Sequence, residues 1–164
     1  MTKRFEKAYN ALCDAFFKGT LAKGTCTACA CGNIVAAAMG ESVLLNPEKI
    51  ECSFGPSNWG TARTFDIYRM KYVPQDPVYA GHTQRNIEEL TGYSPLEMCE
   101  IENAFEKTCK IMVHSYLDHK EEEILEDQYN GLCAVFEVLC ELDNEEVNYK
   151  ERLQTHPKLV LNAV

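Results

Sequence analysis

The 164-residue chain has no apolar run long enough to cross a membrane, which takes about 20 consecutive apolar residues. Its first residues, Met1 to Lys7, enter an amphipathic pattern at once and lack the apolar stretch of a signal peptide. We therefore expect a cytoplasmic protein that does not bind membranes. In the reducing cytosol its nine cysteines should be thiols or metal ligands, since an odd count also suits a disulfide framework poorly.

Catalytic signatures are missing as well. The chain contains no Gly-x-Ser-x-Gly elbow and no Ser/His/Asp order typical of hydrolases. No glycine-rich phosphate-binding turn follows a strand, as a flavin or nicotinamide nucleotide would require. We therefore assign no catalytic residue, and the sequence gives no positive support for an enzyme.

Positive charge is scarce in the second half of the chain. Residues 1–92 carry 10 Lys/Arg and 9 Asp/Glu, whereas residues 93–164 carry 6 and 16, so charges of +1 and −10 give the total of −9. Nucleic-acid binding is not expected, because it depends on neutralising phosphates with Lys and Arg. The acidic half suits a protein partner with a basic surface, or it serves only as a solvated, soluble face.

The hydrophobic periodicity predicts a mainly α protein, a single compact domain over residues 1–164 with four to five helices. An irregular or small β segment is expected around 41–81, where Phe65, Ile67 and Tyr72-Val73 alternate loosely enough for a short hairpin. The tail from Asn144 is polar, and Pro157 argues against a long helix there. The helices are expected at residues 3–18, 25–40, 82–91, 94–112 and 121–142.

Ser94-Pro95-Leu96-Glu97 is a strong helix start, with a capping serine, proline in the first turn and a glutamate that reaches back to the cap. The apolar stripe of this helix should pack against the apolar stripe of residues 121–142. The four glutamates of the helix that starts at Ser94 should face away from this contact. The contact is expected through Ile101, Phe105, Leu132, Phe136 and Leu139, and the outward glutamates are Glu97, Glu100, Glu102 and Glu106.

Cys26, Cys29 and Cys31 stand together at the expected start of a small-residue helix. Free N–H groups and the helix dipole stabilise thiolates at such a position. One interpretation is a structural zinc site, because Cys-x2-Cys is the usual half-site for a tetrahedral ion. Cys26 and Cys29 would be two ligands and Cys109 the third. The fourth stays open among Cys31, Cys52 and His114.

Two other interpretations of these cysteines remain. Cys26 and Cys29 have the spacing of a redox pair, so the alternative function is thiol-redox or iron–sulfur electron transfer. No strand is expected before the pair, however, and Cys31 adds a third thiol. The remaining interpretation is that all three are small side chains buried in a tightly packed helix.

Three short blocks resemble a group of short bacterial and phage proteins that often carry the label of a sodium-translocating NADH:quinone reductase component. The blocks are Cys26-x-x-Cys29 through Ile34, Gly92 through Glu97, and Gly131 through Asp143. That label implies an iron–sulfur cluster, but a plant-type cluster needs Cys-x4-Cys-x2-Cys, which Cys26-x2-Cys29-x1-Cys31 does not supply. The resemblance implies a phage or mobile-element origin and no defined activity.

Together these observations predict a small acidic cytosolic accessory or protein-interaction protein. Its fold would be stabilised by a zinc ion bound by cysteine, with Cys26, Cys29, Cys109 and Cys31 as the candidate metal ligands.

Overall fold

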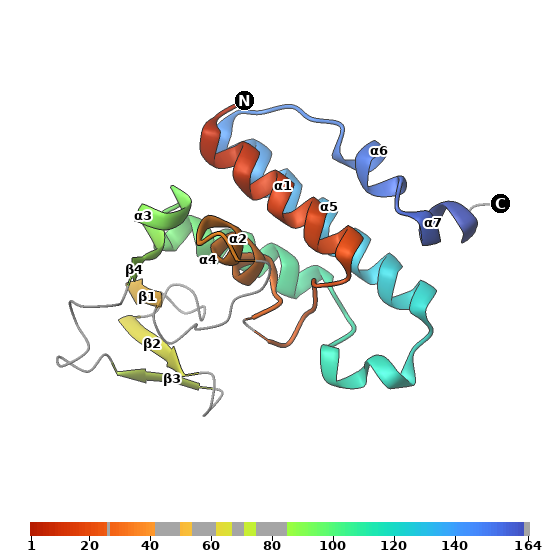
Figure 1. Cartoon of the computed structure of the whole chain (residues 1–164), viewed down its shortest axis with the longest axis horizontal. Helices are drawn as coiled ribbons and strands as arrows, with labels where there is room; N and C mark the ends of the chain where they lie inside the picture. The colour runs from red at the N-terminus through yellow and green to blue at the C-terminus, as the bar shows by residue number, and fades with distance from the viewer. Residues whose placement is uncertain (26, 42–49, 54–61, 67–70, 75–84, 163–164) are drawn as a thin grey trace.

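A computed structural model describes residues 1–25, 27–41, 50–53, 62–66, 71–74 and 85–162 of the chain. The protein is mainly α, as predicted, with a small four-stranded sheet beside the helices (Figure 1). In the described part, no helix is both long and apolar enough to cross a bilayer. The helices are α1 (Lys3–Lys18), α2 (Ala30–Ala38), α3 (Ile87–Thr91), α4 (Pro95–Thr108), the 3-10 helix η3 (Val113–Asp118), α5 (Glu121–Asp143), α6 (Tyr149–Gln154) and α7 (Pro157–Asn162).

The first helix begins and ends where the sequence predicts. The Thr2 hydroxyl accepts the backbone N–H of Phe5, and Gly19 ends the helix in the left-handed region at φ 74°. Glycine adopts that conformation at little cost, which is why it ends helices so often. The apolar stripe of α1 is buried against α2 and α5, and α1 lies along α5 in Figure 1.

The core is centred on the packing of α4 against α5. All five residues predicted to make this contact are fully buried, at 0% exposure: Ile101, Phe105, Leu132, Phe136 and Leu139. The Ser94 capping box forms as predicted, with Glu97 and Ser94 satisfying each other's backbone N–H groups. The helix is shorter than expected, however. It ends at Thr108, and Met112, the last residue of the expected range, lies outside the helix and is exposed.

The sequence predicts an irregular or small β segment around 41–81, and three of the four described strands lie there. The strands are β1 (Ile50–Ser53), β2 (Ala62–Asp66), β3 (Lys71–Pro74) and β4 (Arg85–Asn86), in the order β3-β2-β1-β4. The predicted hairpin is β2 and β3, which pair antiparallel with Phe65 opposite Tyr72. Ile67, also assigned to it, lies outside the described residues. The helix predicted at 82–91 starts only at Ile87, because residues 85–86 pair in parallel with β1.

The tail beyond Asn144 holds two short helices that the sequence analysis did not predict. Asn144 ends α5 in the left-handed region at φ 51°, and the chain turns back along α1 and α5. The Asn148 side chain caps α6, and Pro157 occupies the first turn of α7, where its missing N–H costs no hydrogen bond. Leu153 anchors this segment in the core at 0% exposure.

A polar network at one end of the bundle joins α1, α4 and α5. The Arg4 guanidinium donates to Asp143 Oδ1 at 2.7 Å and to both carboxylate oxygens of Glu97, at 3.1 and 3.2 Å. It also lies 4.3 Å from the centre of the Tyr93 ring, whose hydroxyl donates to Asp143 at 2.6 Å. These contacts fix the carboxyl end of α5, next to which the pocket described below is formed.

Candidate functional site

The cysteine-rich stretch forms the start of α2, five residues later than predicted. Cys29 is the N-cap residue, and its sulfur accepts the backbone N–H of Gly32 at 3.3 Å. The Asn33 side chain holds the preceding loop by donating to the carbonyl oxygens of Thr20, Ala28 and Cys29. Cys26 lies outside the described residues.

A buried carboxyl group also lies at the start of α2. Glu102 Oε2 accepts the backbone N–H of Cys31 at 3.0 Å, and Glu102 is only 5% exposed. The prediction that Glu102 faces away from the core is therefore wrong. Burial raises the pKa of Glu102 to about 7, and the neighbouring Glu106 adds to this, although the Cys31 N–H acts in the opposite direction.

The Cys31 side chain behaves as a protonated thiol. Its Sγ donates to the Met98 carbonyl oxygen at 3.3 Å, and the residue is fully buried. Burial raises the pKa of Cys31 well above its ordinary value, and the nearby Glu102 and Cys29 raise it further. A thiol with a raised pKa is a poor nucleophile at neutral pH, because nucleophilic attack needs the thiolate. In this arrangement Cys31 acts as a core residue.

Cys109 forms a separate thiol environment at the carboxyl end of α4. It is 1% exposed, and its Sγ donates to the Asp127 carbonyl oxygen at 3.6 Å. Burial raises the pKa of Cys109 to about 12, and Asp127 contributes to this increase. Cys109, like Cys31, is therefore a buried thiol that should react slowly.

The other predicted ligands do not complete a metal site within the described residues. His114 is exposed on η3, and Cys52 lies in β1. Across the described ranges, no group of three or more His, Cys, Asp or Glu side chains is arranged to hold a metal ion. Because the zinc site is centred on Cys26, it stays a prediction.

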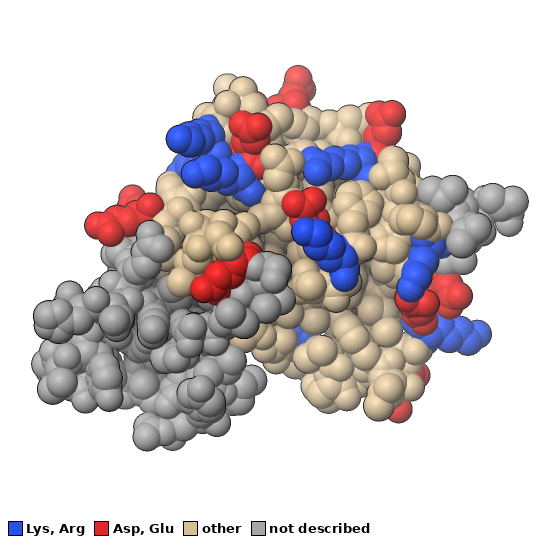
Figure 2. Space-filling view, in the orientation of Figure 1, with Lys and Arg blue, Asp and Glu red and all other residues tan. Residues whose placement is uncertain are grey.

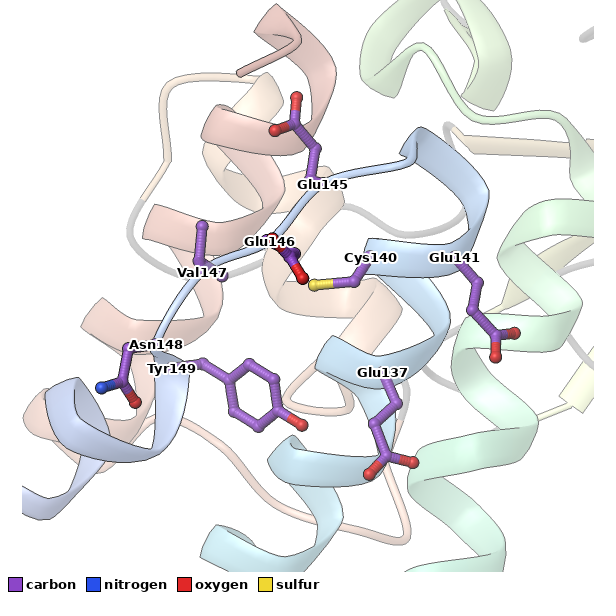
Figure 3. A pocket seen from close by; sticks show the side chains of 8 residues that line it. All are labelled: Glu137, Cys140, Glu141, Glu145, Glu146, Val147, Asn148 and Tyr149. Carbon is purple, nitrogen blue, oxygen red and sulfur yellow. The ribbon is translucent and has the colours of Figure 1, made fainter.

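A pocket of about 650 Å³ opens between the carboxyl end of α5 and the segment that leads into α6 (Figure 3). Two walls form it. Glu137, Cys140 and Glu141 come from α5, and residues 145–149 come from the returning chain. Four of the eight lining residues are glutamates: Glu137, Glu141, Glu145 and Glu146. The lining is therefore acidic, with Val147 and the Tyr149 ring as its apolar part.

The sequence of α5 and of the turn after it explains this pocket. Glu137 and Glu141 are four residues apart and so lie on one helix face. The left-handed Asn144 then reverses the chain, so that residues 145–149 run back beside the end of α5. The Tyr149 ring is fixed by the Phe136 ring, with their centres 5.4 Å apart. The spacing of the glutamates was visible in the sequence, but the reversal at Asn144 was not predicted.

The pocket has a negative electrostatic environment. Burial raises the pKa of Cys140, and Glu145, Asp143 and Glu146 raise it further despite a hydrogen bond with Val147. Burial likewise raises the pKa of Tyr149, with Glu137 as the next contribution. Both groups would become anions on ionisation, so nearby carboxylates hold them neutral. The same field favours a cation in the pocket.

Three of the four glutamates have no cationic partner among the described side chains. No Lys, Arg or His of that part lies within ion-pair distance of Glu137, Glu141 or Glu146, whereas Glu145 accepts the backbone N–H of Thr2 at 2.6 Å. The face shown in Figure 2, by contrast, mixes Lys and Arg with Asp and Glu. The pocket, in contrast, has four glutamates and no Lys or Arg among its lining residues.

Comparison of the chain with family models, with curated proteins and with solved structures finds no match.

Proposed function

We propose that the protein is a small accessory protein that binds a basic segment of a partner protein through the acidic pocket between α5 and residues 145–149. The observation that carries this proposal is the pocket lined by four glutamates, three of which lack a cationic partner in the described part of the chain. A Lys or Arg side chain would supply the missing charge. Its alkyl part would lie against Val147 and the Tyr149 ring.

The position of the pocket on α5 strengthens its attraction for a cation. A helix carries a partial negative charge at its carboxyl end, where the last carbonyl groups have no partner within the helix. The last turn of α5 contains no basic residue that would neutralise this charge. The helix end and the glutamates therefore act in the same direction, and the aromatic ring of Tyr149 adds a favourable surface for a guanidinium.

The competing interpretation is that the glutamates only keep the protein soluble. Binding of a fluorescent oligo-lysine peptide separates the two. The triple variant E137Q/E141Q/E146Q removes the unpaired charges with little change of shape. Each exposed ion pair contributes about 0.2–1 kcal/mol, so we expect the variant to bind roughly tenfold more weakly than the wild type. The affinity of the wild type should also fall as salt rises, because salt screens exposed charges.

A matched control has the same change in net charge elsewhere. Glu100, Glu122 and Glu126 are exposed, so E100Q/E122Q/E126Q removes three charges without touching the pocket. This control should retain the wild-type affinity. Equal losses in the two triple variants would show that only net charge matters, and no loss in the pocket variant would also overturn the proposal.

A further inference from the structure

His156 lies in the connection between α6 and α7, and it is the buried imidazole of the described chain, at 6% exposure. Its ring packs against two phenyl rings at the carboxyl end of α1. The ring centres lie 4.9 Å from Phe16 and 5.8 Å from Phe17, and the Phe17 contact is stacked. His156 is therefore the point where the segment of residues 149–159 reaches the end of α1.

The hydrogen bonds of His156 define its protonation state. Its Nδ1 accepts the backbone N–H of Lys158, with 3.2 Å between the two nitrogens. A nitrogen that accepts a hydrogen bond carries no proton, so the docked ring is the neutral form with its proton on Nε2. A protonated ring would place an N–H against the Lys158 N–H and break this bond.

The remaining contacts of the segment do not depend on pH near neutrality. Leu153 is fully buried, and the Tyr149 ring packs on Phe136. The Arg152 guanidinium donates to Asn10 at 2.9 Å and lies 5.0 Å from the centre of the Tyr9 ring. Because these groups keep their charge between about pH 5 and pH 8, His156 is the group of this segment that changes charge in that range.

We propose that His156 is a proton-sensitive latch that holds α6 and α7 against α1 and α5 when neutral and weakens their attachment when protonated. This would give the chain a segment that loosens locally in mild acid while the α4–α5 core stays folded. The latch is independent of the proposed pocket function. Residues 145–149 line the pocket and lead into α6, so loosening of α6 would also alter the pocket. Only this effect on the pocket rests on the proposed function.

The charged groups around His156 do not reverse this expectation. From its own segment Lys158 opposes a second positive charge, whereas Glu121 of α5 favours it, and these two side chains form an ion pair with each other. Lys18, the basic residue in the last turn of α1, is a further positive charge at the helix end against which His156 packs. Burial is the strongest of these effects and lowers the pKa of His156 below its ordinary value. The positive charge of Lys158 lowers it further and is the second strongest effect. The phenyl rings would attract an imidazolium, by about 0.5–1 kcal/mol at exposed sites.

The direction of the pH effect follows from this lowered pKa. The folded protein binds a proton at His156 less readily than the unfolded chain does. The contribution of the neutral ring to stability is therefore fully present above about pH 6.5 and is lost as the pH falls through the lower pKa of the folded protein.

Amide hydrogen exchange, corrected for the intrinsic effect of pH, tests the proposal. Between about pH 7.5 and about pH 5, protection of residues 149–159 in the wild type should fall several-fold relative to α4. H156F keeps a ring against the phenyl groups and H156N keeps an acceptor for the Lys158 N–H, and neither titrates, so both should lose this pH response. H114N replaces an exposed histidine and should keep it.

A titration of the histidine rings of the wild type by NMR tests the same idea without any variant at position 156. His156 should titrate below the ordinary histidine pKa of about 6.5. Titration of His156 at or above that value would overturn the latch. Unchanged protection of residues 149–159 in acid would overturn it as well.

Discussion

Glu102 Oε2 lies 3.0 Å from the backbone nitrogen of Cys31, across 71 positions of sequence. The Cys31 N–H at the start of α2 thus donates to a carboxyl group of the same chain, whereas the Gly32 N–H donates to the Cys29 sulfur. A helix start stabilises a thiolate only when it offers that thiolate its N–H groups and its partial positive charge. Here Glu102 accepts the N–H of Cys31 itself, and burial together with this carboxyl group raises the pKa of Cys31, so Cys31 stays a buried thiol.

Thiol reactivity should follow burial rather than position in the cysteine-rich stretch. Burial raises the pKa of Cys13 to about 11 and that of Cys109 to about 12, and it raises the pKa of Cys31 well above its ordinary value. Alkylation at about pH 8, followed by mass spectrometry of the peptides, should label these three slowest. The half-buried Cys133 and Cys140 should react faster. Labelling of Cys31 at the rate of Cys140 would contradict this description of the start of α2.

The same experiment separates the interpretations of Cys26. A redox pair predicts that Cys26 reacts faster than every other cysteine, with no metal bound. A zinc site predicts about one zinc per chain and a lower Tm after chelation or in Cys26→Ser, with no change of metal content in Cys133→Ala or Cys140→Ala. Metal-free protein of full stability would reject the zinc site.

The α4–α5 contact should contribute a large part of the stability. Phe105 and Phe136 are both fully buried, and truncation of a buried phenylalanine to alanine typically costs about 3–5 kcal/mol. We expect that loss of unfolding free energy from Phe105→Ala or Phe136→Ala in denaturant titrations. Leu117→Ala is the control, because this side chain is fully exposed and its loss should cost less than about 0.5 kcal/mol. A loss well under 1 kcal/mol at either phenylalanine would place it outside the core.

Gly131 allows α4 and α5 to approach closely. A Cβ atom at this position would overlap Cys109 Sγ and lie 3.2 Å from the Phe105 ring. Alanine normally stabilises a helix relative to glycine by about 1 kcal/mol, but the overlap should make Gly131→Ala destabilising by about 1–3 kcal/mol.

Removal of the Cys109 sulfur tests that explanation. The double variant G131A/C109A should be more stable than the sum of the two single effects predicts, because the overlapping atom is gone. Strict additivity in denaturant titrations would show that the strain lies elsewhere.

Acid should weaken the network around Arg4. Partial burial acts to raise the pKa of Glu97, but the Ser94 backbone N–H and Arg4 outweigh it and lower that pKa. Glu97 therefore contributes stability above about pH 4.3, its ordinary pKa, and this contribution is lost as the pH falls through the lowered value. Glu97→Gln keeps a capping side chain but not the charge. The substitution should lower the free energy of unfolding by about 0.5–1.5 kcal/mol at neutral pH and change it little below about pH 3. An equal cost at both pH values would exclude the charge as its cause.

Helices with a single apolar stripe and a clear cap could be predicted from the sequence. The 3–18 helix and the Ser94 cap were predicted correctly, and the five residues expected at the α4–α5 contact are all buried in the core. Glu102 was missed because α4 is buried on two sides, by α5 and by α2, so a residue beside its main stripe also becomes buried.

The pocket could be predicted only in part, because it depends on tertiary structure. The acidic excess after residue 93 and the spacing of Glu137 and Glu141 are sequence properties. The second wall depends on the left-handed Asn144 and on the docking of Tyr149 and Leu153, which hold the returning chain near α5. No local pattern specifies those contacts.

A map of amide chemical shifts during titration with an oligo-lysine peptide tests the central proposal most directly. The acidic pocket predicts that the largest shifts fall on the end of α5 and on residues 145–149, and that Val147 and Tyr149 move with them. It also predicts that E137Q/E141Q/E146Q abolishes these shifts while E100Q/E122Q/E126Q leaves them unchanged. Shifts centred on the glutamates at the start of α5, or spread evenly over the acidic surface, would contradict the proposal.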